Sequence, residues 1–254
     1  MIGKLGRVGA FVVAAGVSRA VYAGLRRRDD EGWRRENRAG RSVDLYAGPA
    51  TAVGTALAVA SAARGGSARP KPGGGPAAFA VLAAGACGAY DDLRGDERRG
   101  FRAHLGALRR GEVTSGAVKL LGIGAAGLVA GALLKERPVD KVLAGVVIAG
   151  TAHFVNLVDV APGRAALTVL ALGAPGLLRG SLAAAPMGAA AAVLADDLGE
   201  RTMLGDTGAH ALGAAVGSAI AAGNGRFGLA VHAAGLIAAA AYGEQLSAPA
   251  RSPM

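Results

Sequence analysis

The sequence is short of the residues on which soluble and disulfide-bonded domains depend. Its 254 residues include a single cysteine, so no disulfide can form within the chain. Only 18% of the residues are charged and 4% are aromatic, whereas 52% are hydrophobic. This balance is too apolar for a typical soluble domain, which indicates that much of the surface faces lipid.

Small residues supply most of this apolarity. The chain contains 42 glycines, and alanine fills many of the apolar runs. Both residue types are nearly neutral for insertion into a membrane, so each span is only weakly marked, but they allow helix backbones to approach closely. The sequence therefore predicts an all-α fold, a polytopic transmembrane helix bundle that forms one integral membrane domain over residues 1–254.

About nine spans are expected, and some are shorter than the roughly 20 residues that a full crossing takes. The expected spans are 8–25, 45–63, 76–90, 115–134, 142–158, 165–178, 181–195, 208–223 and 227–243. The third, sixth and seventh are the short ones. The first has the order of charged and apolar residues of a signal peptide, but its apolar stretch continues past Arg19 to Leu25, so we interpret it as an uncleaved span.

The basic residues lie between the apolar runs, and the formal net charge is +10 at pH 7. This placement favours a polybasic rim that meets anionic membrane lipids or an anionic substrate, and it argues against a nucleic-acid partner. The first, third, fifth and seventh loops, with the C-terminal tail, carry 16 lysines and arginines, whereas the other loops and the N-terminus carry 10. The positive-inside rule then places the former loops in the cytoplasm and the N-terminus outside, as in a multi-pass protein of the cell membrane.

Three acidic motifs fall on that cytoplasmic side, each where an apolar span meets a loop. They are "GAYDDLRG" with Asp91 and Asp92, "FVNLVDVAPGRA" with Asn156 and Asp159, and "MLGDTGAH" with Asp206. Acidic groups at membrane depth are costly and indicate function. Neighbouring carboxylates repel each other unless a cation neutralises them, and hard oxygen ligands favour Mg2+ or Mn2+. The motifs therefore predict a metal site at the membrane boundary.

Each motif also has a purely structural interpretation. Asp91 and Asp92, followed by arginine and glycine, could begin a solvated loop. Asp206 could cap the helix that follows it by accepting a backbone N–H bond. Asn156 and Asp159 are one helical turn apart and could bond to neighbouring helices. The position of all three motifs at span ends on one side of the membrane favours a shared site.

The motifs resemble, in order and spacing, the signatures of the polyprenyl-phosphate N-acetylhexosamine-1-phosphate transferases, a superfamily that includes phospho-N-acetylmuramoyl-pentapeptide transferase. The segment "YDDLRG" is similar to the family's Asp-Asp motif, "NLVD" to its Asn-x-x-Asp motif, and "LGDTG" to its Gly-Asp-x-Gly motif before a long helix. The stretch from Gly100 to Gly122 resembles the long cytoplasmic loop of such enzymes. The likeness covers about Gly85 to Gly217, which makes the chain similar to a short, divergent member.

The resemblance implies an enzyme that transfers a sugar 1-phosphate from a UDP-sugar to a polyprenyl phosphate carrier and releases UMP, for synthesis of a cell-envelope polysaccharide or glycolipid. It implies that Asp91 and Asp92 engage Mg2+ or Mn2+ and the lipid phosphate, and that Asp206 is a direct metal ligand. The other implied residues would hold the nucleotide or clamp phosphates with forked or basic donors. These substrate-binding residues are Asn156, Asp159, Arg34, Arg35, Arg38, Arg164 and His104.

The chain departs from the family pattern in two places. The second motif usually continues as Asp-Gly-x-Asp, but Asp159 is followed by Val160, Ala161 and Pro162, and the family's late histidine-rich loop has no counterpart. Two other functional classes stay open: a catalytically inactive relative that acts as a membrane scaffold, and a transporter or flippase whose acids couple to ions. The sequence also leaves open whether the chain is a monomer or a homodimer.

Overall fold

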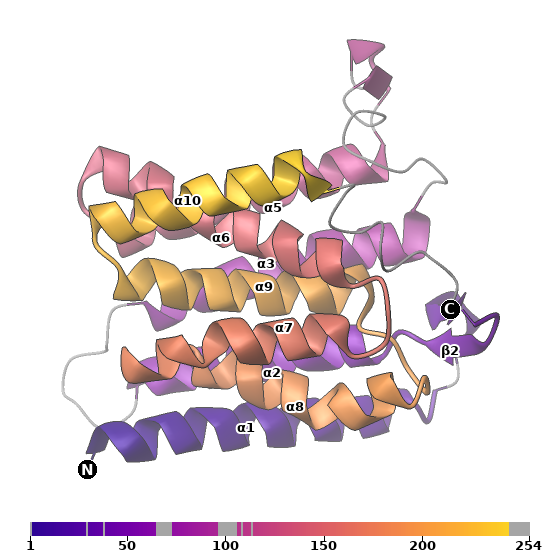
Figure 1. The fold of residues 1–254 in the computed structure, drawn as a ribbon. Helices are drawn as coiled ribbons and strands as arrows, with labels where there is room; N and C mark the ends of the chain where they lie inside the picture. Colours follow the sequence, from indigo (N-terminus) through magenta and orange to yellow (C-terminus); the bar gives the residue numbers. More distant parts are fainter. Residues whose placement is uncertain are drawn as a thin grey trace.

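In the computed structural model the chain is a bundle of helices that lie side by side (Figure 1). The structure describes residues 2–28, 30–37, 39–64, 73–95, 106–107, 109–112 and 114–243. The α-helices in these ranges are α1 (Ile2–Leu25), α2 (Ala47–Arg64), α3 (Gly74–Arg94), α5 (Ser115–Leu134), α6 (Pro138–Val158), α7 (Arg164–Gly173), α8 (Ala184–Leu198), α9 (Gly205–Gly223) and α10 (Arg226–Ala241). Short elements join them: η1 (Glu31–Trp33), β1 (Arg34–Glu36), β2 (Ser42–Asp44) and η2 (Pro175–Leu178). The predicted all-α class is confirmed, with one small addition in β1 and β2.

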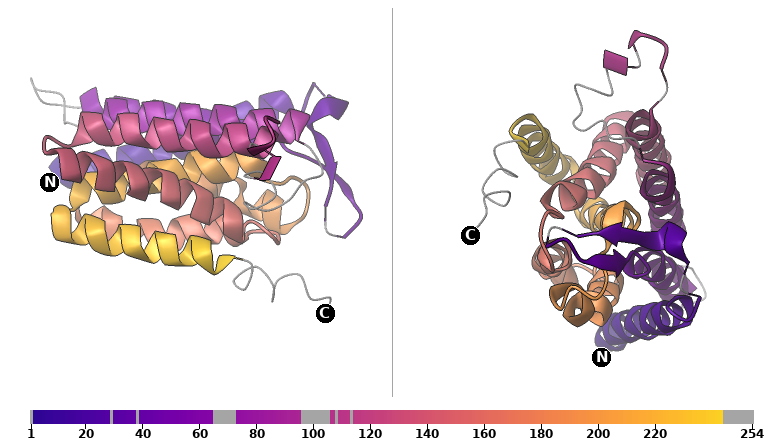
Figure 2. Two further views of the ribbon diagram at one scale, coloured as in Figure 1. Left: turned by 90° about the horizontal axis from the view of Figure 1, so that it is seen from above. Right: turned by 90° about the vertical axis from the view of Figure 1, so that its right-hand side faces the viewer.

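Successive helices run in opposite directions along the bundle (Figure 1). The hairpin formed by β1 and β2 lies at one end, and the right-hand view of Figure 2 looks onto that end. Helices α3 and α6 finish at the hairpin end, and α5 and α9 begin there (Figure 1). The three helices that carry the acidic motifs therefore bring those motifs to the same end of the molecule.

Three of the described helices are long and apolar enough to cross a membrane, which points to a membrane protein. These segments are Gly6–Leu25, Ser115–Leu134 and Pro138–Val158. Shorter apolar helices cover Ala47–Ser61, Arg164–Leu178 and Arg226–Ala241. Each of the nine expected segments coincides with a described helix, so the helix positions are confirmed. The prediction of about nine membrane crossings is not, because three of the described helices are long and apolar enough to span a membrane.

Two of the expected short spans differ in length from the helices that form. Helix α3 has 21 residues and extends the expected span 76–90 at both ends. Helix α7 has 10 residues and ends at Gly173. Pro175 follows at the start of η2 and lacks a backbone N–H, so it cannot continue the α-helical hydrogen-bond pattern.

Small residues pack the centre of the bundle, as the composition predicts. A Cβ atom added at Gly213 of α9 would lie 2.7 Å from the Cα atom of Ala152 in α6, and one added at Gly217 would lie 2.8 Å from the Cα atom of Ile148. No side chain fits into these spaces, so the backbones of α6 and α9 touch each other. This close contact fixes α9, whose first turn carries Asp206, against α6.

The antiparallel hairpin of β1 and β2 was not predicted from the sequence. Its residue pairs are Arg34 with Asp44, Arg35 with Val43, and Glu36 with Ser42. The turn is held by the side chain of Asn37, which accepts two backbone N–H bonds, and by Gly40, whose φ of +74° favours glycine. Each strand has only three residues and β1 is entirely charged, so neither is long enough for an alternating pattern to indicate a strand.

Candidate functional site

Four polar side chains from four helices meet at the hairpin end of the bundle. The Nζ atom of Lys119 in α5 lies 2.7 Å from an Asp91 carboxylate oxygen of α3 and also forms an ion pair with Asp206 of α9. The Asn156 side chain of α6 donates a hydrogen bond to the other Asp206 oxygen at 2.5 Å. The Lys119, Asp91 and Asp206 side chains are 18%, 19% and 22% exposed, so the cluster is sheltered but open to solvent. We refer to Asp91, Lys119, Asn156 and Asp206 as the acidic site.

Lys119 is the member of the acidic site that the sequence interpretation missed. It is the fifth residue of α5, a helix apolar enough to span a membrane. A charged residue in such a helix is costly and by default indicates a partner or a function. That signal was present in the sequence. The sequence did not show, however, that Lys119 binds two carboxylates, because one comes from α3 and the other from α9.

Asp92 faces a different direction from Asp91. One of its carboxylate oxygens accepts the backbone N–H of Asp206 at 3.0 Å, and the other accepts the backbone N–H and the hydroxyl of Thr207 at 2.9 and 2.6 Å. Asp92 thus caps the N-terminus of α9, where backbone N–H groups lack partners within the helix. The expected cap at Asp206 is wrong, because Leu204 holds the cap position without a side-chain bond and the Asp206 side chain points to Lys119 and Asn156.

Asp159 lies at the end of α6, near other carboxylates. Burial raises the pKa of the Asp159 carboxyl well above its ordinary value, and Asp197, Asp206 and Asp92 raise that pKa further. Asp197 is itself bound, since it accepts the backbone N–H of Gly163 at 3.0 Å. Asp159 therefore belongs to the same electrostatic neighbourhood as the acidic site, although it does not share Lys119.

The predicted basic residues are divided between the acidic site and more exposed positions. The Arg35 guanidinium, on β1, donates to the backbone carbonyl of Asp92 and so lies beside the end of α3. Arg34 is exposed on the same strand, and Arg164 is exposed at the first residue of α7. The two remaining predicted residues, Arg38 and His104, lie outside the described residues.

The donors of the acidic site fit a small divalent cation with few protein ligands. Asp91 and Asp206 already share one cation, the Lys119 ammonium group. Mg2+ is commonly bound through one or two carboxylates, with water and substrate phosphates completing its shell. Over the described parts of the chain, no group of three or more histidine, cysteine, aspartate or glutamate side chains is arranged to hold a metal ion. Asp91 and Asp206 are thus the residues that would hold Mg2+ or Mn2+, while the Asp92 oxygens face the α9 backbone.

Comparison with known proteins adds no assignment. No protein-family model matches the sequence, and no curated protein matches it.

A glycine in α3 allows Asp91 and Asp92 to lie next to α9. A methyl group at Gly88 would be 2.5 Å from the Asp206 carbonyl carbon and 2.7 Å from the Thr207 backbone nitrogen. We expect Gly88→Ala to force α3 away from α9 and to lower stability by about 1 to 3 kcal/mol. Thermal unfolding of the detergent-purified protein measures the effect.

The matched control for Gly88→Ala is Gly124→Ala in α5, where an added Cβ would meet nothing within 4 Å. Removing a helical glycine there should leave the melting temperature unchanged or raise it, since alanine favours helices by about 1 kcal/mol over glycine. Equal melting temperatures for the two variants would show that α3 and α9 are not in close contact at Gly88.

The raised pKa of Asp159 predicts a pH-dependent stability. Because this pKa is higher in the folded than in the unfolded chain, ionisation of Asp159 removes stability as the pH rises through the folded-state pKa. We expect Asp159→Asn to unfold at a higher temperature than the parent at pH 7, with the difference shrinking as the pH falls to about 4. Melting temperatures measured across that pH range test the sign.

Glu200, at the same end of the bundle, has a lowered pKa and so should depend on pH in the opposite direction. Its hydrogen bond and ion pair with Arg41 lower the pKa of Glu200, so its contribution to stability is present above the ordinary glutamate pKa and is lost as the pH falls. Glu200→Gln should therefore lose stability at pH 7 and approach the parent in acid. If both variants shift in the same direction at pH 7, burial of Asp159 and repulsion from its neighbouring carboxylates are not the cause.

Proposed function

We propose that this protein transfers a sugar 1-phosphate from a UDP-sugar to polyprenyl phosphate at the cytoplasmic face of the cell membrane and releases UMP. The observation that supports the proposal is the meeting of Asp91, Lys119, Asn156 and Asp206 at one end of an apolar bundle. Both reactants are anionic and one is a lipid, so the reaction needs charged groups where apolar helices reach water. The acidic site is such a place.

The proposal includes the placement of the chain in the membrane. We place the hairpin end in the cytoplasm and the N-terminus outside, with the helices of the bundle as the spans of a multi-pass protein. The alternating helix directions support this placement, because they put the more basic set of loops at the hairpin end (Figure 1). The polybasic rim then meets anionic head groups and anionic substrates at the same depth as the acidic site.

In the proposed reaction an oxygen of the lipid phosphate forms a bond to the phosphorus that carries the sugar. The bond from that phosphorus to the bridging oxygen breaks, and UMP leaves with the electron pair. The lipid phosphate is already largely ionised at neutral pH, so positioning of the two reactants contributes more than removal of a proton. In this proposal the acidic site supplies the charged groups around the two reactants.

Each residue of the site has a proposed task. The Lys119 ammonium and the Arg35 guanidinium supply positive charge to phosphate oxygens, and arginine does so with a forked pair of donors. Asn156 fixes the rotamer of Asp206 through its hydrogen bond. A Mg2+ or Mn2+ ion held by Asp91 and Asp206 would neutralise charge that develops on the pyrophosphate.

Release of UMP tests the proposal directly. The full chain, purified in detergent, is mixed with polyprenyl phosphate, Mg2+ and one of a panel of UDP-sugars, and UMP is quantified over time. We expect release with at least one sugar nucleotide, and only when polyprenyl phosphate is present. The panel identifies the sugar.

Other results would support the alternative functions. Folded protein that releases no UMP with any sugar nucleotide would support a membrane scaffold that has kept the bundle without the reaction. Movement of ions or of a lipid across proteoliposomes, again without UMP, would support a transporter or flippase. Release that does not depend on polyprenyl phosphate would indicate hydrolysis of the nucleotide rather than transfer.

A further inference from the structure

The loop between α8 and α9, residues 199–204, leads directly into the first turn of α9 and so determines where Asp206 lies. Loops at the end of a bundle are usually the least constrained part of a helical protein. This loop is different, because it runs beside β2 and forms an isolated parallel bridge with it at Asp44 and Thr202. The hairpin therefore contacts the segment that presents Asp206.

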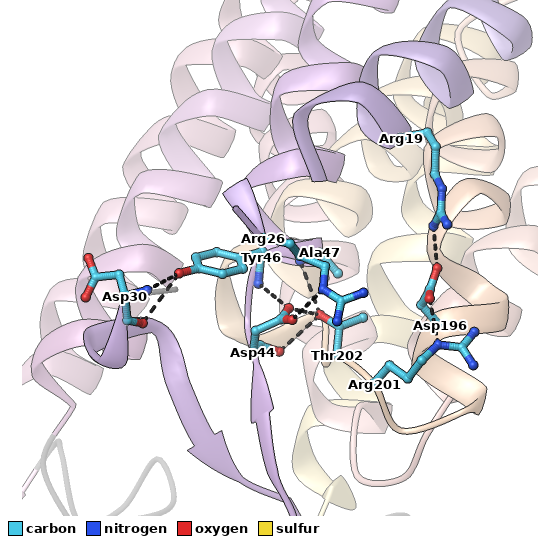
Figure 3. A network of polar contacts seen from close by, with 9 residues as sticks. All are labelled: Arg19, Arg26, Asp30, Asp44, Tyr46, Ala47, Asp196, Arg201 and Thr202. Carbon is cyan, nitrogen blue, oxygen red and sulfur yellow. Dashed lines mark hydrogen bonds and ion pairs between the residues drawn. The ribbon is translucent and has the colours of Figure 1, made fainter. Parts of the chain in front are cut away.

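The first attachment is at the base of the hairpin. The Thr202 hydroxyl is fully buried and lies 2.6 Å from an Asp44 carboxylate oxygen, and the Met203 backbone N–H donates to the Asp44 carbonyl at 2.9 Å. Figure 3 shows the Asp44 and Thr202 side chains pointing toward each other, with Arg26 beside the same carboxylate. Thr202 is four residues before Asp206, so this contact fixes the chain just ahead of the acidic site.

The second attachment is at the turn of the hairpin. Glu200 has a φ of +51°, a left-handed conformation that is uncommon for a residue other than glycine. Its carboxylate is held by two residues of the hairpin turn region, with contacts of 2.6 Å to Asn37 and 2.5 Å to Arg41. Such a conformation persists where the surroundings over-determine it. The loop is thus held at both ends of the hairpin.

The third attachment joins the hairpin to α3. Arg35 of β1 donates to the backbone carbonyl of Asp92, the residue whose carboxylate caps α9. The same hairpin therefore binds two of the three segments that carry acidic motifs, at Asp92 on one side and at Thr202 on the other. None of these contacts lies between members of the acidic site itself.

We propose that the hairpin is a clasp that sets the position of Asp206 relative to Asp92, and that Thr202 and Asp44 are positioning residues of the acidic site. The catalytic consequence rests on the proposed transferase function, whereas the structural consequence does not. If the clasp is loosened at Thr202, the two hydrogen bonds from the Asp206 and Thr207 amides to Asp92 open more often. Those amides report the geometry of the site without any turnover.

The test compares Thr202→Val with two other variants in the full chain. Valine keeps the branched shape of Thr202 and replaces its hydroxyl with a methyl group. Thr55→Val in α2 is the matched control, because among the described residues the Thr55 hydroxyl is buried without a hydrogen-bond partner. Thr202→Ser restores a hydroxyl and should restore the parent behaviour.

Hydrogen exchange of the peptide that contains the Asp206 and Thr207 amides is the first measurement. We expect exchange about tenfold faster in Thr202→Val, the effect of losing a hydrogen bond to a charged group, and parent rates in Thr55→Val and Thr202→Ser. Parent rates in folded Thr202→Val would overturn the clasp. Equal acceleration in Thr55→Val would also overturn it, since the effect would then be general loosening.

Turnover is the second measurement, made on the UMP assay. We expect Thr202→Val to lower kcat about tenfold while KM for polyprenyl phosphate stays within about twofold, because a misplaced Asp206 affects the reaction more than lipid capture. An unchanged kcat together with faster exchange would show that the clasp orders the loop without positioning a reacting group. If the parent chain itself releases no UMP, the proposed function fails, while the exchange result still decides whether the clasp exists.

Discussion

Asp206→Asn is expected to reduce UMP release by about 100-fold or more while the bundle stays folded. Asp206 is the one carboxylate of the acidic site that joins three helices, through the Lys119 ammonium of α5 and the Asn156 amide of α6. Asparagine preserves the shape of the side chain and removes its charge. The site then keeps a single carboxylate, Asp91, to hold a cation next to the pyrophosphate. The UMP assay gives the activity, and thermal unfolding shows whether the fold survives.

The control for Asp206→Asn is Asp140→Asn, at the opposite end of the bundle. Asp140 is also in the first turn of a helix and is also ion-paired, to Arg226 at 2.7 Å. The Asp140→Asn substitution removes the same charge from a position far from the acidic site, so turnover should stay close to that of the parent. Near-normal turnover in Asp206→Asn would show that the reaction does not need the Asp206 carboxylate. An equal loss of turnover in both variants would show that loss of an ion pair anywhere in the bundle lowers activity.

The sequence predicted where the helices are because apolar runs mark them. Each expected span coincides with a described helix, and the acidic motifs lie at one end of the bundle, as their positions at span ends indicated. Small residues in the apolar runs also predicted close backbone contacts, which Gly213 and Gly217 make. These features are local in the sequence or follow from its composition, so no knowledge of the fold is needed to read them.

The different partners of Asp91 and Asp92 could not be predicted from the sequence. Successive residues of an α-helix point about 100° apart, so two adjacent carboxylates meet different neighbours. Asp91 meets Lys119, whereas Asp92 meets the N-terminus of α9. Which of the two directions faces which helix depends on how α3 is rotated in the bundle, and the weak apolar pattern of an alanine- and glycine-rich helix does not specify that rotation.

The hairpin and its contacts could not be predicted from the sequence, for a different reason. Asp44 and Thr202 are 158 residues apart, and Asn37 and Glu200 are 163 apart. Pairings at such separations follow from the topology of the whole bundle. The strand residues are largely polar, and the turn signal at Asn37 and Gly40 sits in a basic segment that composition assigns to a solvated loop.

Lys119→Met is expected to reduce UMP release to a similar extent as Asp206→Asn and, at the same time, to increase the stabilisation of the protein by Mg2+. Methionine has a similar length and suits an apolar helix, so α5 should still form. Without the ammonium group, Asp91 and Asp206 face each other uncompensated, and repulsion between them makes a divalent cation the remaining partner that neutralises both. The loss of turnover follows because Lys119 also supplies positive charge to phosphate oxygens in the proposed reaction.

Two measurements on Lys119→Met separate these effects. The rise in melting temperature with added Mg2+ reports the affinity of the carboxylate pair for the ion, because a ligand that binds only the folded state stabilises it in proportion to that affinity. The UMP assay reports the reaction. The matched control is Lys135→Met, because Lys135 directly follows the last residue of α5 and its Nζ atom donates to the Asn224 backbone carbonyl at 2.8 Å rather than bridging two carboxylates. If Mg2+ stabilises Lys119→Met no more than Lys135→Met, then Asp91 and Asp206 do not bind the ion together, and Lys119 serves the fold rather than a metal-dependent site.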